Sequence, residues 1–150
     1  NGTMRRHFRL QHPVVVESID PRHWCLRLGV EQVELAAFCC ELMLLHFEMV
    51  ERLSLLGDRA RKLTLACHAE HRSAAEVESE AVRLTFCRRD LEAVLGFLLA
   101  WYRDGTSSVS HLDINLASDD SAGIDRTLLV EAGQSRPPMP ADEAIRLLRK

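Results

Sequence analysis

The 150-residue sequence predicts an α+β domain with a mostly antiparallel sheet of about six strands, built from ββα-type units and packed against one long and one shorter helix. Two observations predict this class. Short segments with β-branched or alternating apolar residues come in pairs, and a helical pattern follows each pair. Apolar residues make up 47% of the chain, which at this length is enough to form one core without disulfides or metals.

The first unit combines two strands with a long helix. Residues 13–19 are β-branched, and residues 24–28 predict a second strand after the turn at Asp20. Residues 30–56 then predict one helix, closed by Gly57. One apolar stripe of this helix contains Val33, Ala37, Cys40, Leu44 and Phe47, and another contains Leu35, Phe38, Leu42, Leu45, Met49 and Leu56. A helix that is apolar on two sides must be covered on two sides, by the sheet and by a second layer or a second subunit.

The second unit repeats the order of two strands and a helix. Residues 63–67 and 77–87 predict two strands that pair as an antiparallel hairpin. Asp90 is a suitable N-cap for the shorter helix over residues 91–103, and Gly105 follows its end.

The third unit is the least regular. Residues 111–116 alternate apolar and polar side chains, and residues 124–131 predict one more strand. Residues 134–140 are rich in proline and predict a linker. Residues 141–150 predict a short helix that is acidic at its start and basic at its end, as the helix dipole favours.

Composition limits where and how the protein works. Residues 1–3 precede Met4 and are expected to be a remnant of cloning, so the predicted domain covers residues 4–133. The net charge is −3, and the five cysteines lie in apolar segments, which is typical of reduced thiols in a cytoplasmic protein. The most apolar run, residues 35–47, is shorter than the ~20 residues of a membrane span, so we expect no membrane contact.

No motif typical of an enzyme occurs in the sequence, so we expect no catalytic activity, no cofactor and no metal. Cys67, His68 and His71 are metal-ligating residue types. On a strand, however, Cys67 and His71 lie about 13 Å apart and cannot hold one ion by themselves. The alternative for an enzyme is a site built from His68, His71 and His111.

Basic residues gather at two points of the chain besides the N-terminal run around Arg5 and Arg9. Three of them lead into the strand at 63–67 and two follow the strand at 77–87, so an antiparallel hairpin would place them at one end of the sheet. Such a basic sheet edge could contact nucleic-acid phosphates. The possible contacts are Arg59, Arg61, Lys62, Arg88 and Arg89.

A family resemblance covers residues 24–84. It is carried by the strand at 24–28, the segment at 31–38, the long Leu/Met helix, and the strands that follow with Glu76-Val77-Glu78 between them. This pattern resembles a small cyanobacterial family of unknown function whose members are similar to the Whirly and Pur-alpha group. The resemblance implies a curved sheet packed on helices and binding of single-stranded nucleic acid. The helix at 91–103 and the strands after it depart from that family, and no functional residue can be carried over.

The leading hypothesis is a non-enzymatic intracellular binding module that self-associates, as a homodimer, and docks a protein partner through apolar helix surface. The predicted interface residues are Phe38, Leu42, Leu45, Met49, Phe97 and Trp101. The alternative is a single-stranded nucleic-acid-binding protein that uses the basic sheet edge.

Overall fold

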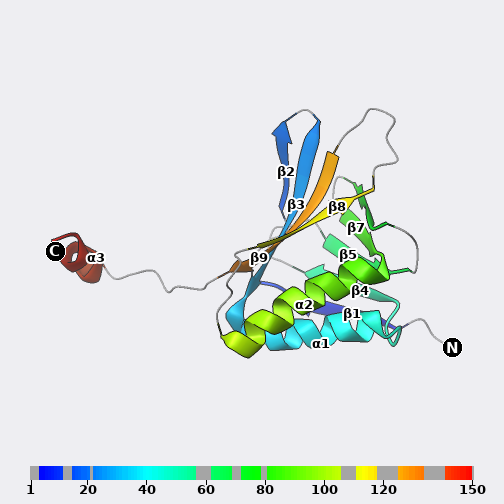
Figure 1. Ribbon diagram of the computed structural model, residues 1–150, viewed down its shortest axis with the longest axis horizontal. Helices are drawn as coiled ribbons and strands as arrows, with labels where there is room; N and C mark the ends of the chain where they lie inside the picture. Colours follow the sequence, from blue (N-terminus) through cyan, green and yellow to red (C-terminus); the bar gives the residue numbers. More distant parts are fainter. Residues whose placement is uncertain are drawn as a thin grey trace.

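The computed structural model describes residues 4–11, 15–20, 22–56, 62–68, 72–78, 81–105, 111–117, 125–133 and 141–149. Figure 1 shows two sheets with a pair of helices beside them, and the predicted α+β class is confirmed. None of the helices in these residues is long and apolar enough to cross a membrane.

Sheet A has five strands in the order β1-β4-β5-β7-β6. They are β1 (Arg5–Arg9), β4 (Arg52–Leu56), β5 (Lys62–Cys67), β6 (Ala74–Val77) and β7 (Ala81–Phe86). β1 runs parallel to β4 and β5 runs parallel to β7, whereas the other two pairs are antiparallel. Alternate residues of the central strands, such as Leu63 and Leu65, point into the core and are fully buried.

Sheet B has four strands in the order β2-β3-β9-β8. They are β2 (Val15–Asp20), β3 (His23–Glu31), β8 (His111–Leu116) and β9 (Asp125–Gly133). The two middle strands, β3 and β9, are parallel. A single parallel bridge between Ala74 and Ala117 joins the two sheets.

Two antiparallel helices cover the inner face of sheet A. A short 3-10 turn (Gln32–Glu34) leads into α1 (Leu35–His46), and α2 (Arg88–Asp104) packs beside it. The start of α1 lies at the end of α2, because the side-chain amide of Gln32 donates to the carbonyl of Gly105 at 3.3 Å. A further helix, α3 (Ala141–Leu148), forms where the sequence predicts it.

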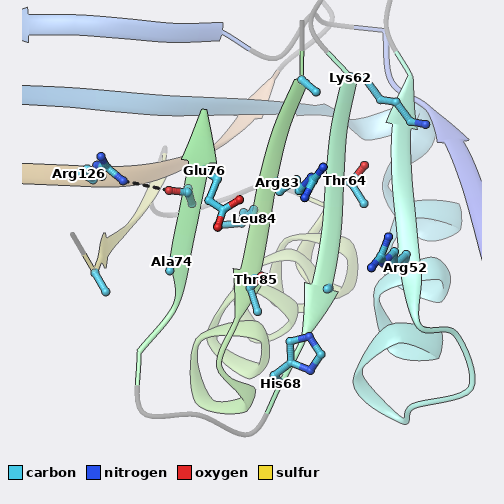
Figure 2. A pocket seen from close by; sticks show the side chains of 14 residues that line it. Arg52, Lys62, Thr64, His68, Ala74, Glu76, Arg83, Leu84, Thr85 and Arg126 are labelled. Carbon is cyan, nitrogen blue, oxygen red and sulfur yellow. Dashed lines mark hydrogen bonds between the residues drawn. The ribbon is translucent and has the colours of Figure 1, made fainter. Parts of the chain in front are cut away.

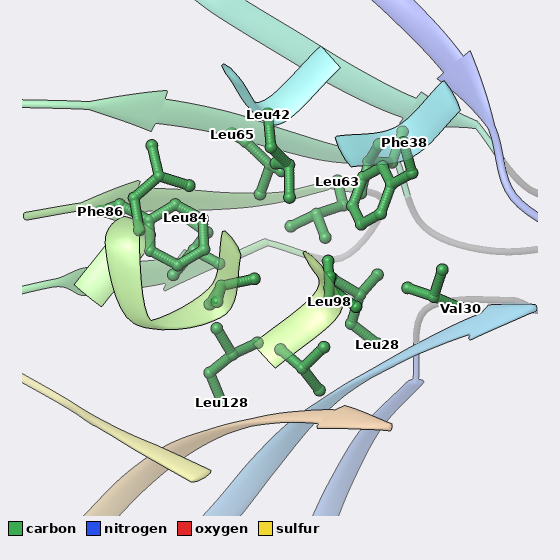
Figure 3. Packing of buried hydrophobic residues seen from close by; sticks show 14 of the residues in the cluster. Leu28, Val30, Phe38, Leu42, Leu63, Leu65, Leu84, Phe86, Leu98 and Leu128 are labelled. Carbon is green, nitrogen blue, oxygen red and sulfur yellow. The ribbon is translucent and has the colours of Figure 1, made fainter. Parts of the chain in front are cut away.

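One hydrophobic cluster connects both sheets and both helices (Figure 3). Leu28 and Leu128 enter it from sheet B, Leu63 and Leu84 enter it from sheet A, and Leu98 of α2 lies between them. Each of these side chains has less than 2% of its surface exposed. The helices therefore share one core with both sheets.

The predicted long helix over residues 30–56 is wrong in its second half. α1 ends at His46, and the chain returns as strand β4, whose Leu53 and Leu55 are buried in the sheet. Glu48 has φ 60°, and the amide of Met49 donates to the carbonyl of Leu44, as in the turn that usually closes a helix at glycine. Because a glutamate fills the glycine position, the sequence carries no visible stop signal there.

Two further expectations need correction, and two strands form that the sequence did not indicate. There are two mixed sheets with nine strands in the described residues, instead of one sheet of about six. The N-terminal basic run forms β1, and residues 74–77 form β6. The predicted hairpin of residues 63–67 with 77–87 does not form, because β6 pairs antiparallel with β7 and β5 lies parallel to β7 on its other side.

Candidate functional site

The outer side of α1 and of the turn before it is an exposed apolar surface. We call it the α1 face. Its members are Val33, Ala36, Ala37, Cys40, Leu44 and Phe47. Val33 is 74% exposed and Phe47 is 63% exposed. None of the six side chains is charged, although a helix that faces water normally carries charges on that side.

The charged and polar groups of α1 lie on its two flanks. Toward β1, Glu41 accepts two hydrogen bonds from the guanidinium of Arg6, at 2.6 and 2.7 Å. Toward α2, the ring nitrogen Nε2 of His46 lies 3.0 Å from a carboxylate oxygen of Glu92. The ion pair with Arg6 and the contact with Glu92 thus connect α1 to its own neighbours and leave the α1 face apolar.

On α2, two exposed apolar side chains lie among charged ones such as Glu92 and Arg103. Leu99 and Tyr102 project from the side of α2 that carries Glu92, the partner of α1. Leu99 is 38% exposed and Tyr102 is 60% exposed. Met49 follows the C-terminal end of α1 and is 63% exposed.

Most of the predicted interface residues lie elsewhere. Phe38, Leu42, Leu45 and Trp101 are at most 3% exposed and belong to the core, so they cannot meet a partner. Phe97 is half-buried and packs against the core, whereas Met49 is exposed as required. The sequence contained both apolar stripes of the helix, and the stripe that begins at Val33 is the one left uncovered. Spacing alone could not decide between them, because both stripes have helical periodicity.

The predicted basic edge does not assemble. Lys62 opens β5 beside Ala81, which opens β7, because the two strands are parallel. Arg88 and Arg89 follow the far end of β7 and begin α2, so a full strand length separates them from Lys62. Arg59 and Arg61 lie outside the described residues. The antiparallel pairing on which the cluster depended is absent between these two strands.

A different set of basic residues gathers on the outer face of sheet A, which we call the basic face. Its members are Arg5, Arg9, Arg52, Lys62 and Arg83. Arg5 is paired with Arg52 across β1 and β4, so their side chains leave the same side of the sheet. That side lies opposite the helices, because the next residue along β1, Arg6, reaches α1.

The basic face contains a shallow hollow of about 510 Å³ (Figure 2). Arg52, Lys62 and Arg83 project around a floor of small side chains, including Thr64 and Thr85. At the margin next to sheet B, Arg126 of β9 donates to the carbonyl of Ala75 at 3.0 Å and lies 5.1 Å from the ring centre of Trp24. Glu76 is the acidic residue among those that line the hollow.

The metal and enzyme alternatives find no assembled site in the part of the chain that the structure describes. No group of three His, Cys, Asp or Glu side chains lies close enough there to hold a metal ion. His68 lies at the end of β5 and His111 at the start of β8, in the other sheet, while His71 falls outside the described residues. Burial raises the pKa of the Cys67 thiol, which makes it a poor nucleophile.

The comparisons with known proteins do not assign a family. No protein-family model matches the sequence, and no curated protein is similar enough to match it. The resemblance to the Whirly and Pur-alpha group therefore stays a prediction.

Proposed function

We propose that the protein is a non-enzymatic binding module that self-associates through the α1 face. The observation that carries this proposal is that the whole exposed side of α1 is apolar and uncharged, from Val33 to Phe47. Continuous exposed apolar surface of this kind is typical of protein interfaces. The odd number of cysteines in apolar segments supports a reducing compartment such as the cytoplasm.

The shape of the α1 face favours a second copy of the chain as its partner. Small side chains occupy its centre, Ala36, Ala37 and Cys40, and larger ones occupy its ends. In an antiparallel pair of α1 helices related by a two-fold axis near Cys40, Phe47 of one copy meets Val33 of the other. The small central residues let the two helices approach closely while the large end residues fill the remaining space, so one surface complements itself.

The expected gain from this contact is substantial. A fully exposed phenylalanine offers about 200 Å² of surface, and Phe47 exposes 63% of its own. Covering that area in both copies removes roughly 250 Å² of mostly apolar surface from water, worth about 6 kcal/mol before the entropy of association is deducted. Val33, Leu99 and Tyr102 add to this area. A stable interface buries about 800 Å² per partner, so the contact must extend from α1 to neighbouring surface on α2.

The first test compares oligomeric states by light scattering after gel filtration. We expect the protein to be a dimer, Phe47→Glu to be a folded monomer, and the matched control Leu148→Glu on α3 to remain a dimer. Phe47 and Leu148 are both exposed, at 63% and 85%, so neither change should disturb the core. A protein that is monomeric at high micromolar concentration would contradict the proposal.

A second test locates the two-fold axis. Cys40 is exposed, whereas the neighbouring Cys39 is buried. A short thiol-specific cross-linker should therefore join two copies through Cys40, and Cys40→Ser should abolish the covalent dimer. Cross-linking that persists in Cys40→Ser would place the contact on another surface.

A further inference from the structure

We infer that the basic face of sheet A binds a chain of linked phosphates, such as inorganic polyphosphate. The face lies on the opposite side of sheet A from α1, so a ligand here does not depend on self-association through the α1 face.

The positive charges are spread over several neighbouring strands of the sheet. Arg52 and Lys62 belong to the neighbouring strands β4 and β5, and Arg83 belongs to β7, next to β5. Arg83 stands beside Thr64, two residues from Lys62 in β5. Residues two apart along a strand leave the same face about 6.6 Å apart, and neighbouring strands are about 4.8 Å apart. The charges therefore form an array over which a flexible polyanion can place several phosphates at once.

Two of these cations are available to a ligand. Within the described residues, neither Arg52 nor Lys62 forms an ion pair with a carboxylate. Arg83 has a long contact, 3.9 Å, with Glu78, and both side chains are more than half exposed. An exposed pair of this length contributes little and can open when a phosphate binds.

The floor of the hollow suits phosphate oxygens. Thr64 and Thr85 place hydroxyl groups between the cations (Figure 2). The small side chains of the alanines at 66, 74 and 81 leave the hollow open. Arginine, lysine and threonine are the donors that proteins use for phosphate.

The chemistry of the face favours phosphates over bases. Proteins that bind single-stranded nucleic acids stack bases on aromatic side chains. Among the residues that line the hollow, none is phenylalanine, tyrosine or tryptophan. The acidic residues of the face are Glu76 on the edge strand β6 and Glu78 just after it, so the part of the sheet away from β6 is the most favourable for a polyanion.

Binding of a long-chain inorganic polyphosphate to the full chain tests this inference, measured by calorimetry at low and moderate salt. We expect Arg52→Glu with Lys62→Glu to raise Kd at least about tenfold, because four units of charge change under the ligand. The charge-matched control, Arg146→Glu with Arg149→Glu at α3, should leave Kd within about twofold. The Kd of the unmodified protein should rise steeply with salt, and less steeply for the Arg52/Lys62 variant.

The neutral variant Arg52→Gln with Lys62→Gln is a milder change that should not affect folding, since both side chains are exposed. Its Kd should lie between that of the unmodified protein and that of the variant with two glutamates. Far-ultraviolet circular dichroism must show the same fold for all variants. Absence of polyphosphate binding, or equal weakening in the α3 control, would overturn the inference. Tighter binding of a single-stranded oligonucleotide of equal charge would also overturn it and would assign the face to nucleic acid.

Discussion

The hydroxyl of Ser73 holds the start of α2, and its removal should destabilise the protein strongly. Ser73 is fully buried just before β6. Its hydroxyl donates to a carboxylate oxygen of Asp90 at 2.6 Å and accepts the amide of Cys87 at 2.9 Å. Cys87 occupies the N-cap position of α2 and offers no side-chain cap of its own, so Ser73 supplies the cap from another element. The carbonyl of Ser73 also accepts the amide of Ala117, beyond β8.

The cost of Ser73→Ala follows from these two hydrogen bonds. A hydrogen bond to a charged group contributes about 1.5–3 kcal/mol, and one to a neutral amide contributes about 1 kcal/mol. Asp90 is only half-buried and can recover water, whereas the amide of Cys87 is left unsatisfied in a buried place. We therefore expect a loss of about 3 kcal/mol, which at about 2.1 cal/mol/K per residue lowers Tm by about 9 °C for this chain length.

Urea denaturation and thermal melting followed by circular dichroism measure this loss. Ser54→Ala is the matched control, because Ser54 is buried in β4 but forms no side-chain hydrogen bond among the described residues. The control should lose less than about 1 kcal/mol. If Ser73→Ala lost no more than the control, the reasoning about the cap of α2 would be refuted.

Four other substitutions test the local structure. Glu48→Gly should stabilise the protein by about 1 kcal/mol in urea denaturation, because Glu48 holds φ 60° at the end of α1; an unchanged midpoint would contradict this. Gly96→Ala should raise the free energy of unfolding by about 1 kcal/mol, since an added Cβ on this exposed position inside α2 meets nothing within 4 Å. Gly105→Ala should lower it by a similar amount, because Gly105 holds φ 72° at the end of the helix. A change of the same sign for both variants would contradict the place of Gly96 inside α2 and of Gly105 at its end. Burial raises the pKa of the Cys39 thiol to about 11, so alkylation at neutral pH should label Cys40 and spare Cys39. The pKa of Cys39 in the folded protein lies above its unfolded value near 9, so the contribution of this thiol to stability is complete below pH 9 and is lost as the pH rises toward 11. If the free energy of unfolding did not change with pH over that range in either the wild type or Cys39→Ala, this prediction would be contradicted.

Local patterns predicted most of the elements. The alternation at residues 111–116 matches β8, the helical spacing at 91–103 lies within α2, and Gly105 ends that helix in the left-handed conformation. These features depend on nearby residues, which the sequence displays directly. The class of fold followed from them.

Pairing between distant strands was not predictable in the same way. The two stretches at 63–67 and 77–87 both read as strands, but only long-range packing decides whether they pair antiparallel or parallel with a further strand at the edge. The way these strands pair also determines which basic residues lie close together. The predicted basic edge depended on that hairpin and does not form without it. The basic face lies instead on β1, β4, β5 and β7, and its Arg5 and Arg52 are separated in the sequence by β2, β3 and the whole of α1.

The exposed apolar surface of α1 was only partly predicted. The observation that one helix is apolar on two sides was correct for α1, because both its core stripe and its outer face contain apolar residues. Which stripe lies against the sheet depends on how the helix is rotated. The rotation is set by contacts such as Phe8 with Phe38, whose ring centres are 5.5 Å apart, and periodicity does not reveal those contacts.

The parallel pairing at the centre of sheet B has a consequence for how the chain folds. β3 pairs with β9 from His23 opposite Asp125 to Glu31 opposite Gly133, across most of the sequence. Contacts between such distant segments form slowly, because a large loop must close before they give any stabilisation. During synthesis β3 therefore waits with one edge unpaired and its apolar residues uncovered while α1, sheet A and α2 are made. Strand β9 completes the native topology, and a chain that stops before it leaves β3 as an open edge for aggregation.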